Sequence, residues 1–460
     1  MLFNSYAFLL GFLPIAVAGY SVTSAAPRLR ILVLVALSLA FYSWWNPRFV
    51  LLLLVSILVN WAAARAFVAT RKRAIITGAI VFDLGLLGVF KYANFFAANV
   101  ASVAGARFTP LDIVLPLGIS FFTFHHIMYL VDLRRGRAPL APVDRYALYI
   151  CFFPQAIAGP LARWSEVGQQ FGQRIFAPGW ERRWALGLSF IVFGLVEKVL
   201  LGDPLGKILD PVYANAAART LTDGSAWLAP GFAVQIFFDF AGYSDIAIGL
   251  ALLFGVQLPY NFNAPFRSSS ILELWQRWHM TLSRFLRDYV FLPLADMRIA
   301  GTRHTIPQYV MAFILTMALC GLWHGAGWNF VLWGTMQGVA MVFALGWRRF
   351  IGAPPRLVGW AATIAFFVLT VVIFRTGSLQ AAWHVYAGLA TAPDLKLLMR
   401  SWTLIAAALL AVALPPSQVV CRWIADAPLP LVPAALGVIG VVILIQLGAN
   451  ESYDFIYFQF

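Results

Sequence analysis

Two histidines carry the chemistry that this sequence suggests. His324 lies in the run Gly-Leu-Trp-His-Gly-Ala-Gly-Trp-Asn at residues 321–329, and His279 ends the run Trp-Gln-Arg-Trp-His at residues 275–279. The chain has 460 residues and only six histidines, and most of its length is apolar. An ionisable ring at membrane depth is costly unless it is paired, hydrated or functional. Both histidines are therefore candidate functional residues.

His324 has the neighbours that a general base needs. Imidazole has a reference pKa of about 6.5, so it can take a proton from a hydroxyl group near neutral pH. Small residues beside the ring leave room for a substrate, and aromatic residues surround it. These residues leave two interpretations open: a base at the floor of a cavity, or an interfacial histidine in an aromatic belt. The neighbours are Gly321, Gly325 and Gly327 together with Trp323, Trp328 and Trp333.

The segment around His279, residues 271–294, predicts one amphipathic helix. At about 100° per residue, Arg284 and Asp288 fall within about 20° of Arg277 on the helix surface. His279 lies nearly opposite, so a charged face would meet water or lipid headgroups while His279 turns inward. This pattern alone also fits an interfacial helix with one satisfied core histidine.

Other catalytic arrangements are poorly represented. The sequence has no glycine-rich phosphate loop, no HExxH motif and no GxSxG motif. His125 and His126 are adjacent and cannot both face one ligand, so we predict no metal site and no tightly bound cofactor. Asp239 and Asp245 lie about 120° out of register on a helix, which favours hydrogen bonding inside a bundle over acid–base work. The cysteines lack metal or redox spacing and are expected to be buried: Cys151, Cys320 and Cys421.

The composition predicts an all-α polytopic membrane protein. Hydrophobic residues make up 61% of the chain and charged residues 11%, whereas soluble domains are about 25% charged. Counting apolar runs of about 20 residues gives about eleven spans. The net charge of +14 comes from bases scattered between these runs. Scattered bases fit the enrichment of Lys and Arg in cytoplasmic loops, with the N-terminus outside the cytoplasm, and argue against nucleic-acid binding.

The chain is predicted to form a single membrane domain over residues 1–460. Plain apolar runs in residues 1–100 predict scaffold spans, and similar runs return in residues 339–460. The first run, without a basic residue before Arg28, is expected to be a retained span and not a signal peptide. Residues 113–338 hold the polar, Pro- and Gly-interrupted segments of a catalytic core. Broken backbone at membrane depth is tolerated where it is buried or lines a wet cavity, so we expect a cavity there.

These residues together resemble a known family. The chain is similar to the membrane-bound O-acyltransferase superfamily, and within it to the bacterial polysaccharide O-acetyltransferases of the alginate type. The likeness runs nearly end to end, and its motifs are long. The matching stretches are residues 115–132, 152–160, 235–249, 258–294, 321–338 and 455–460.

The resemblance implies a fold and a set of site residues. Family members form a ring of tilted helices, with re-entrant or interfacial helices, around a central funnel. The catalytic histidine of the superfamily maps onto His324, and a second, variable Asn/His position maps onto His279. His279 would then orient or polarise a thioester carbonyl, or help to hold the donor. Arg277, Arg284 and Arg287 would either attract a phosphate-bearing donor or reach to lipid headgroups. The expected substrate-binding residues are Asn261, Trp275, Arg277, Trp278, Arg284, Trp323 and Asn329.

The resemblance also implies a function. An acetyl group would pass from a cytoplasmic thioester, acetyl-coenzyme A or another acyl thioester, across the bacterial cytoplasmic membrane to an exported polysaccharide, with alginate first among the acceptors. The expected partners are membrane lipids, the polysaccharide and an extracytoplasmic SGNH-like acetyltransferase. Three alternatives stay open: D-alanyl transfer to teichoic acid, O-acetylation of peptidoglycan or cellulose, and a non-catalytic transporter or flippase.

Overall fold

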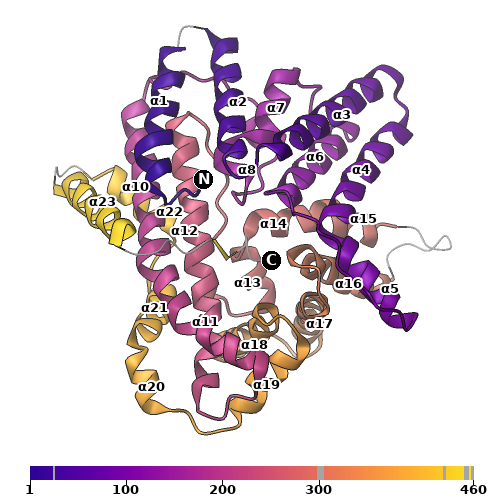
Figure 1. Ribbon diagram of the computed structural model, residues 1–460, viewed down its shortest axis with the longest axis vertical. Coiled ribbons are helices and arrows are strands. Elements are labelled where there is room, and N and C mark those ends of the chain that lie inside the picture. Colours follow the sequence, from indigo (N-terminus) through magenta and orange to yellow (C-terminus); the bar gives the residue numbers. More distant parts are fainter. Residues whose placement is uncertain (24–25, 298–304, 428–430, 450–454, 457–460) are drawn as a thin grey trace. The chain divides into compact units, whose positions relative to one another are not determined.

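The regular elements of the chain are helices. The computed structural model describes residues 1–23, 26–297, 305–427, 431–449 and 455–456, and within these ranges every regular element is helical (Figure 1). The predicted all-α class is thus confirmed. Seven helical segments of the described residues are long and apolar enough to cross a membrane. They span Arg48–Thr70, Arg73–Val103, Trp180–Ala218, Ser225–Leu253, Ile306–His324, Trp328–Phe350 and Arg356–Arg375.

Among the described residues, fewer helices than the expected eleven are long enough on their own to count as spans. A helix pair bent by 76°, Trp402–Ala413 with Ser417–Ala425, raises the count to eight if it forms one span. Other apolar runs form helices that are shorter than the usual span of about 20 residues, among them Ala7–Val22 and Pro27–Ser43. The difference arises because a count of apolar residues does not register the breaks that divide a run into shorter helices.

The chain forms two compact units. Unit 1 holds Met1–Leu195, Tyr243–Tyr260 and Gln418–Asp454, and unit 2 holds Val196–Gly242, Asn261–Ser417 and Phe455–Phe460. Helix α12 (Phe232–Leu253) contributes residues to both units. The other helices of unit 1 are η1 (Ala7–Phe12), α1 (Leu13–Val22), α2 (Pro27–Ser43), α3 (Arg48–Thr70), α4 (Arg73–Leu87), η2 (Gly88–Tyr92), α5 (Ala93–Val103), α6 (Ile119–Arg134), α7 (Val143–Cys151), α8 (Phe153–Ala156), α9 (Trp164–Val167), α10 (Trp180–Leu195), α22 (Ser417–Ala425) and α23 (Leu431–Ala449).

Helices α3, α4, α6 and α7 of unit 1 pack against one another (Figure 1). A buried network of polar side chains connects them. Asn60 Nδ2 donates to Asp83 Oδ1 at 2.7 Å, which joins α3 to α4. His126 Nδ1 lies 2.6 Å from the Tyr146 hydroxyl, and its Nε2 lies 3.3 Å from Ser56 Oγ. In the part of the chain that the structure describes, no three His, Cys, Asp or Glu side chains are grouped so that they could hold a metal ion. His126 of α6 therefore has structural partners, Tyr146 and Ser56.

Unit 2 contains both candidate histidines. A sharp hairpin of α16 and α17 is its most closely packed pair (Figure 1). The helices of this unit are η3 (Val196–Gly202), α11 (Asp203–Ala218), η4 (Ser225–Gly231), η5 (Pro265–Arg267), α13 (Ile271–Arg277), α14 (Met280–Phe285), η6 (Leu286–Phe291), α15 (Leu292–Ala295), α16 (Ile306–His324), α17 (Trp328–Phe350), α18 (Arg356–Arg375), α19 (Leu379–Leu389), α20 (Leu395–Arg400) and α21 (Trp402–Ala413).

Glycines set the close approach of α16 and α17. A Cβ atom on Gly321 would overlap the carbonyl oxygen of Phe330, and one on Gly334 would overlap the carbonyl oxygen of Met317. Small residues at such crossings let helix backbones touch, which is how helices associate where apolar burial gives little gain. The hairpin therefore fixes the end of α16, where His324 lies, against α17.

Candidate active site

His324 is the last residue of α16 and is enclosed by aromatic rings. His324 is buried, with 5% of its surface exposed. The centroid of its ring lies 4.8 Å from that of Trp323, 5.6 Å from that of Trp333 and 5.1 Å from that of Phe374. These rings come from α16, α17 and α18, so three helices position the imidazole. Of the three tryptophans predicted around the ring, Trp323 and Trp333 lie against it, whereas Trp328 is largely exposed; Phe374 is a neighbour that local sequence did not indicate.

The turn after His324 requires glycine. Gly325 has an extended backbone, which ends α16 at His324. A Cβ atom on Gly325 would overlap the ring of Phe330, so a larger residue does not fit there. The Gly327 N–H donates to the Gly325 carbonyl at 3.0 Å, and α17 begins at the next residue. This tight turn places His324 at the end of the hairpin where α16 and α17 are connected.

His279 lies in a break between two short helices, and the prediction of one continuous helix is wrong. Helix α13 ends at Arg277, Trp278 is extended, and His279 is left-handed with φ 41° and ψ 52° before α14 begins. The break is held by a separate segment: Met280 N–H donates to the Asn261 carbonyl at 2.8 Å, and Asn263 N–H donates to the Arg277 carbonyl at 2.9 Å. Backbone groups that a helix would have used are therefore paired with residues 261–263.

Because of this break, the predicted charged and apolar faces of a single helix do not exist, but His279 is still buried. The single-helix register that grouped Arg277, Arg284 and Asp288 does not apply across a break. His279 is nevertheless 0% exposed, because the left-handed turn directs its ring into unit 2. Burial lowers the pKa of His279 to about 3, so its imidazole is neutral near pH 7.

Trp323 links the two histidines. Its ring centroid lies 6.4 Å from that of His279 and 4.8 Å from that of His324. The Phe240 ring covers another side of His279 at 4.6 Å. The structure therefore places His279, Trp323 and His324 in one aromatic cluster, although 45 positions in the sequence separate the two histidines.

Asn261 contacts His279 directly. Its Oδ1 lies 3.1 Å from His279 Nδ1. The same oxygen accepts a hydrogen bond from Thr281 Oγ1 at 2.8 Å and from the Thr281 N–H at 3.3 Å. Asn261 is itself 1% exposed. Asn261, one of the predicted substrate-binding residues, therefore touches a candidate catalytic ring through a hydrogen bond.

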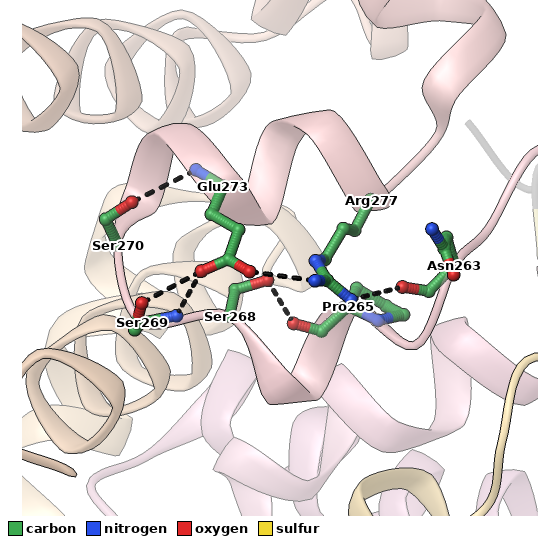
Figure 2. Close-up of polar contacts among 7 residues, drawn as sticks. All are labelled: Asn263, Pro265, Ser268, Ser269, Ser270, Glu273 and Arg277. Atoms are coloured by element: carbon green, nitrogen blue, oxygen red, sulfur yellow. Dashed lines mark hydrogen bonds and ion pairs between the residues drawn. The ribbon is translucent and has the colours of Figure 1, made fainter. Parts of the chain in front are cut away.

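The arginines of this region have ionic partners in the fold. Figure 2 shows Arg277 between Glu273, whose carboxylate lies 2.9 Å from Nη2, and the Asn263 carbonyl, which accepts from Nη1 at 3.2 Å. Glu273 also accepts hydrogen bonds from the N–H and hydroxyl of Ser269 at 2.8 and 2.9 Å (Figure 2). Arg287 pairs with its neighbour Asp288 at 2.7 Å, and Arg284 is half-buried. A donor-binding role for Arg277 and Arg284 stays a prediction.

The two tryptophans of this segment pack in the core. Trp275 Nε1 donates to Gln337 Oε1 on α17 at 3.3 Å, and its ring lies 5.9 Å from that of Trp333. Trp278 is 5% exposed, and its ring packs against Phe262, Phe367 and two other phenylalanines. Trp275 is thus connected to His324 through the ring of Trp333. Substrate contact by either tryptophan stays a prediction.

Asn329 anchors the end of α18 to the start of α17. Its Nδ2 donates to the Ile373 carbonyl at 3.3 Å and to the Thr376 carbonyl at 2.7 Å. The last carbonyls of a helix have no partner within the helix, so this side chain supplies a donor to the Thr376 carbonyl and a second donor to the Ile373 carbonyl, which also accepts from the Thr376 hydroxyl at 3.1 Å. Phe374, which covers His324, lies between these two carbonyls in the sequence.

We expect Asn329→Asp to destabilise the protein more than Asn329→Ala does. Alanine removes both hydrogen bonds and leaves the Thr376 carbonyl without the Asn329 donor, at a cost of about 1–3 kcal/mol, whereas the Ile373 carbonyl keeps the Thr376 hydroxyl. Aspartate removes the same bonds and adds a carboxylate oxygen that faces two carbonyl oxygens. Thermal unfolding in detergent measures the difference, with Asn215→Asp at an exposed position of α11 as the matched control. Equal melting temperatures for the two Asn329 variants would contradict the anchoring role.

A buried charge cluster in unit 2 is not among the features predicted from the sequence. Lys198 Nζ lies 2.7 Å from Asp203 Oδ1 and also pairs with Asp239. The other oxygen of Asp239 accepts the N–H of Ile456 at 3.0 Å. Lys198 could have been found by searching apolar spans for charged residues, because Glu197 and Lys198 follow a long run of residues without a charge.

Phe240, the residue after Asp239, contacts a residue of the candidate site. Phe240 contacts His279 and also packs against Phe455, with ring centroids 5.7 Å apart. The charge cluster and the start of the terminal motif are therefore connected to His279 through Phe240. Residues 457–460 of that motif lie outside the described residues.

Comparison with known proteins identifies the family. The profile of the membrane-bound O-acyltransferase family matches residues 142–380, which include both histidines and more than half of the chain. The chain belongs to the membrane-bound O-acyltransferase family. With its apolar helices, it is therefore a multi-pass membrane O-acyltransferase, which needs an acyl donor and no metal. The alternative of a non-catalytic transporter is set aside.

Relatives of known name cover most of the chain. The probable alginate O-acetylase AlgI of Pseudomonas aeruginosa is 38% identical over 84% of this chain and 74% of its own length. The peptidoglycan O-acetyltransferase of Helicobacter pylori is 34% identical over 85% of this chain and 80% of its own length. The teichoic acid D-alanyltransferase of Streptococcus thermophilus is 29% identical over 51% of this chain and 57% of its own length.

Proposed function

We propose that this membrane O-acyltransferase moves an acetyl group from a cytoplasmic acyl thioester to a hydroxyl group destined for an exported polysaccharide, with alginate as the first candidate acceptor. The observation that carries the proposal is the similarity to probable alginate O-acetylases over 84–88% of the chain. Two histidines whose rings both pack against Trp323 supply a site that suits acyl transfer.

His324 is the proposed general base. It takes the proton of the accepting hydroxyl while the hydroxyl oxygen bonds to the thioester carbonyl carbon. The carbon–sulfur bond then breaks, and the departing thiolate takes the proton from His324. The products are an ester and a free thiol, so the histidine is regenerated. The enclosing rings of Trp323, Trp333 and Phe374 keep water from competing with the acceptor.

The proposed donor is acetyl-coenzyme A or an acetyl thioester on a carrier protein. Both donors carry phosphate groups, which Arg277, Arg284 and Arg287 would attract at a cytoplasmic entrance. The proposed location is the bacterial cytoplasmic membrane, because acyl thioesters are made inside the cell and the polymer is modified outside it. An SGNH-like acetyltransferase outside the membrane would complete the transfer to the polymer.

O-acetylation of peptidoglycan is a second candidate function. It is favoured by the Helicobacter pylori relative, which matches this chain over a similar length. D-alanyl transfer to teichoic acid has weaker support, since those relatives match about half of the chain.

The donor class can be tested with purified protein in nanodiscs. Acetyl-coenzyme A, acetyl carrier protein and D-alanyl carrier protein are offered separately, and release of the free thiol is measured with and without oligosaccharide acceptors. We expect thiol release from an acetyl thioester, accelerated by an acetylatable acceptor and absent in His324→Ala. Thiol release from the D-alanyl carrier alone would replace the acetyl donor by D-alanyl. If no thioester reacts at millimolar concentration, the proposed chemistry is wrong.

A further inference from the structure

The orientation of the Asn261 amide is fixed by a group that can only donate. The backbone N–H of Thr281 points at one of the two terminal atoms of this side chain, at 3.3 Å. An N–H group needs an acceptor, so this atom is the carbonyl oxygen Oδ1 and not the amide nitrogen. The Thr281 hydroxyl donates to the same oxygen at 2.8 Å. The assignment therefore follows from the partners around the side chain.

This orientation decides which ring nitrogen of His279 carries the proton. Asn261 Oδ1 also lies 3.1 Å from His279 Nδ1. Because Oδ1 can only accept, Nδ1 must be the donor. A neutral imidazole has one N–H group, so Nε2 then carries a lone pair. Complete burial keeps the ring in this neutral form near pH 7, as its lowered pKa indicates.

The Nε2 atom has no protein partner among the described residues. It is a buried ring nitrogen of a residue that is 0% exposed, yet no hydrogen bond to it is formed within those residues. A buried polar atom is normally paired, and one that is not has a functional or strained role. The strained left-handed backbone of His279 adds to this, because non-glycine residues rarely take that conformation without a reason.

We propose that Asn261 is a positioning residue that holds His279 in the Nδ1–H tautomer, so that Nε2 accepts a hydrogen bond from an O–H or N–H group of a substrate. This inference rests on the proposed function, in which His279 belongs to the reacting site. The substrate group is distinct from the hydroxyl that His324 deprotonates, since one hydroxyl proton cannot serve both rings. Sugar hydroxyls and the amide N–H groups of an acyl-carrying pantetheine arm have the required chemistry.

The inference revises the role expected for His279 from the sequence. Polarising a thioester carbonyl requires a hydrogen-bond donor aimed at the carbonyl oxygen. In the tautomer set by Asn261, the only N–H of the ring is already used, and the remaining nitrogen can only accept. His279 therefore orients a donor group of the substrate and does not act on the carbonyl.

The tautomer can be read without measuring activity. Protein with ¹⁵N- and ¹³C-labelled histidine is reconstituted in bilayers at neutral pH, and its spectrum is compared with that of His279→Asn to assign the His279 signals. We expect a neutral ring with a protonated Nδ1 and a bare Nε2. In Asn261→Leu the Nδ1–H signal should be lost, whereas Asn261→Asp, which keeps an acceptor at that point, should retain it. A protonated Nε2 in the wild type would overturn the proposal.

Kinetics of the same variants separate positioning from stability. We expect Asn261→Leu to lower kcat/KM about 10–100-fold, the range seen when a group that orients an active-site histidine is removed. Asn261→Asp, which keeps an acceptor for Nδ1 but adds a charge, should recover only part of that loss, and Asn215→Leu on α11 serves as the matched control with wild-type activity expected. If Asn261→Leu does not fold, the wild-type spectrum and Asn261→Asp still decide the matter.

The outcomes also distinguish this inference from the proposed function. Wild-type activity of Asn261→Leu beside an inactive His324→Ala would reject the positioning role and leave the proposed function intact. Full activity of His324→Ala would reject the proposed function, whereas the tautomer measurement would stand independently.

Discussion

Replacing His324 by alanine should reduce acyl transfer by about 10²–10⁴-fold, the usual contribution of a positioned general base. The ring packs against Trp323, Trp333 and Phe374 from α16, α17 and α18, and none of these three side chains can act as a base. His324→Gln, which keeps more of the side-chain volume, should be equally inactive. Both variants should reach the membrane at wild-type levels.

The measurement is the O-acetyl content of the cell's exported polysaccharide at matched expression. His384→Ala is the control, because that half-buried histidine of unit 2 bonds the Ala216 carbonyl through Nδ1 and lies outside the aromatic cluster. We expect near-normal acetylation for His384→Ala. If His324→Gln retains more than about a tenth of the wild-type acetylation, a general-base role for His324 is wrong.

Lys198→Met should cost about 3–5 kcal/mol of stability, the loss expected when one partner of a buried ion pair is removed. The side chain of Lys198 is 4% exposed and lies between Asp203 and Asp239. Without the lysine, two carboxylates remain buried without their cation. The variant should unfold at a markedly lower temperature in detergent, and Lys396→Met at an exposed position of α20 should not.

The triple variant Lys198→Met, Asp203→Asn, Asp239→Asn tests the physical cause. Removing all charges together leaves no unpaired buried ion, so we expect it to recover most of the stability that Lys198→Met loses. If the single and triple variants unfold at the same temperature, the cost comes from packing and not from charge. The amide oxygen introduced by Asp239→Asn can still accept the Ile456 N–H, so that contact is a constant between the two variants.

The features that local sequence determines were predicted well. Apolar runs predicted spans in residues 1–100 and 339–460, and the structure has membrane-length apolar helices in both parts, because helix formation at membrane depth depends on the composition of each segment. The run around His324 predicted a histidine among small and aromatic residues, and the structure places Trp323 and Trp333 against its ring. The expectation that the glycines of that run leave room for a substrate is wrong, because the space beside Gly321 and Gly325 is taken by Phe330 of α17, so these glycines permit contact of α16 with α17.

The features that distant residues determine were not predicted. Residues 271–294 have a clean helical period, yet hydrogen bonds from Asn261 and Asn263, which lie before that segment, break the helix at His279. The charge cluster joins Lys198 to Asp239 over 41 positions, and Phe374 reaches His324 over 50 positions. No periodicity in the sequence encodes these pairings, because they depend on how separate helices pack.

In the proposed function, one protein carries an acyl group from a thioester on one side of the membrane to a hydroxyl group on the other. The direct test uses proteoliposomes of uniform orientation, with labelled acetyl thioester confined to the cytoplasmic side. Oligosaccharide, with and without an extracytoplasmic acetyltransferase, is confined to the opposite side. We predict that covalently bound label appears on the acceptor side with wild-type protein and does not appear with His324→Ala. Transfer that occurs only when thioester and acceptor share one compartment, or that is undiminished in His324→Ala, would contradict the account.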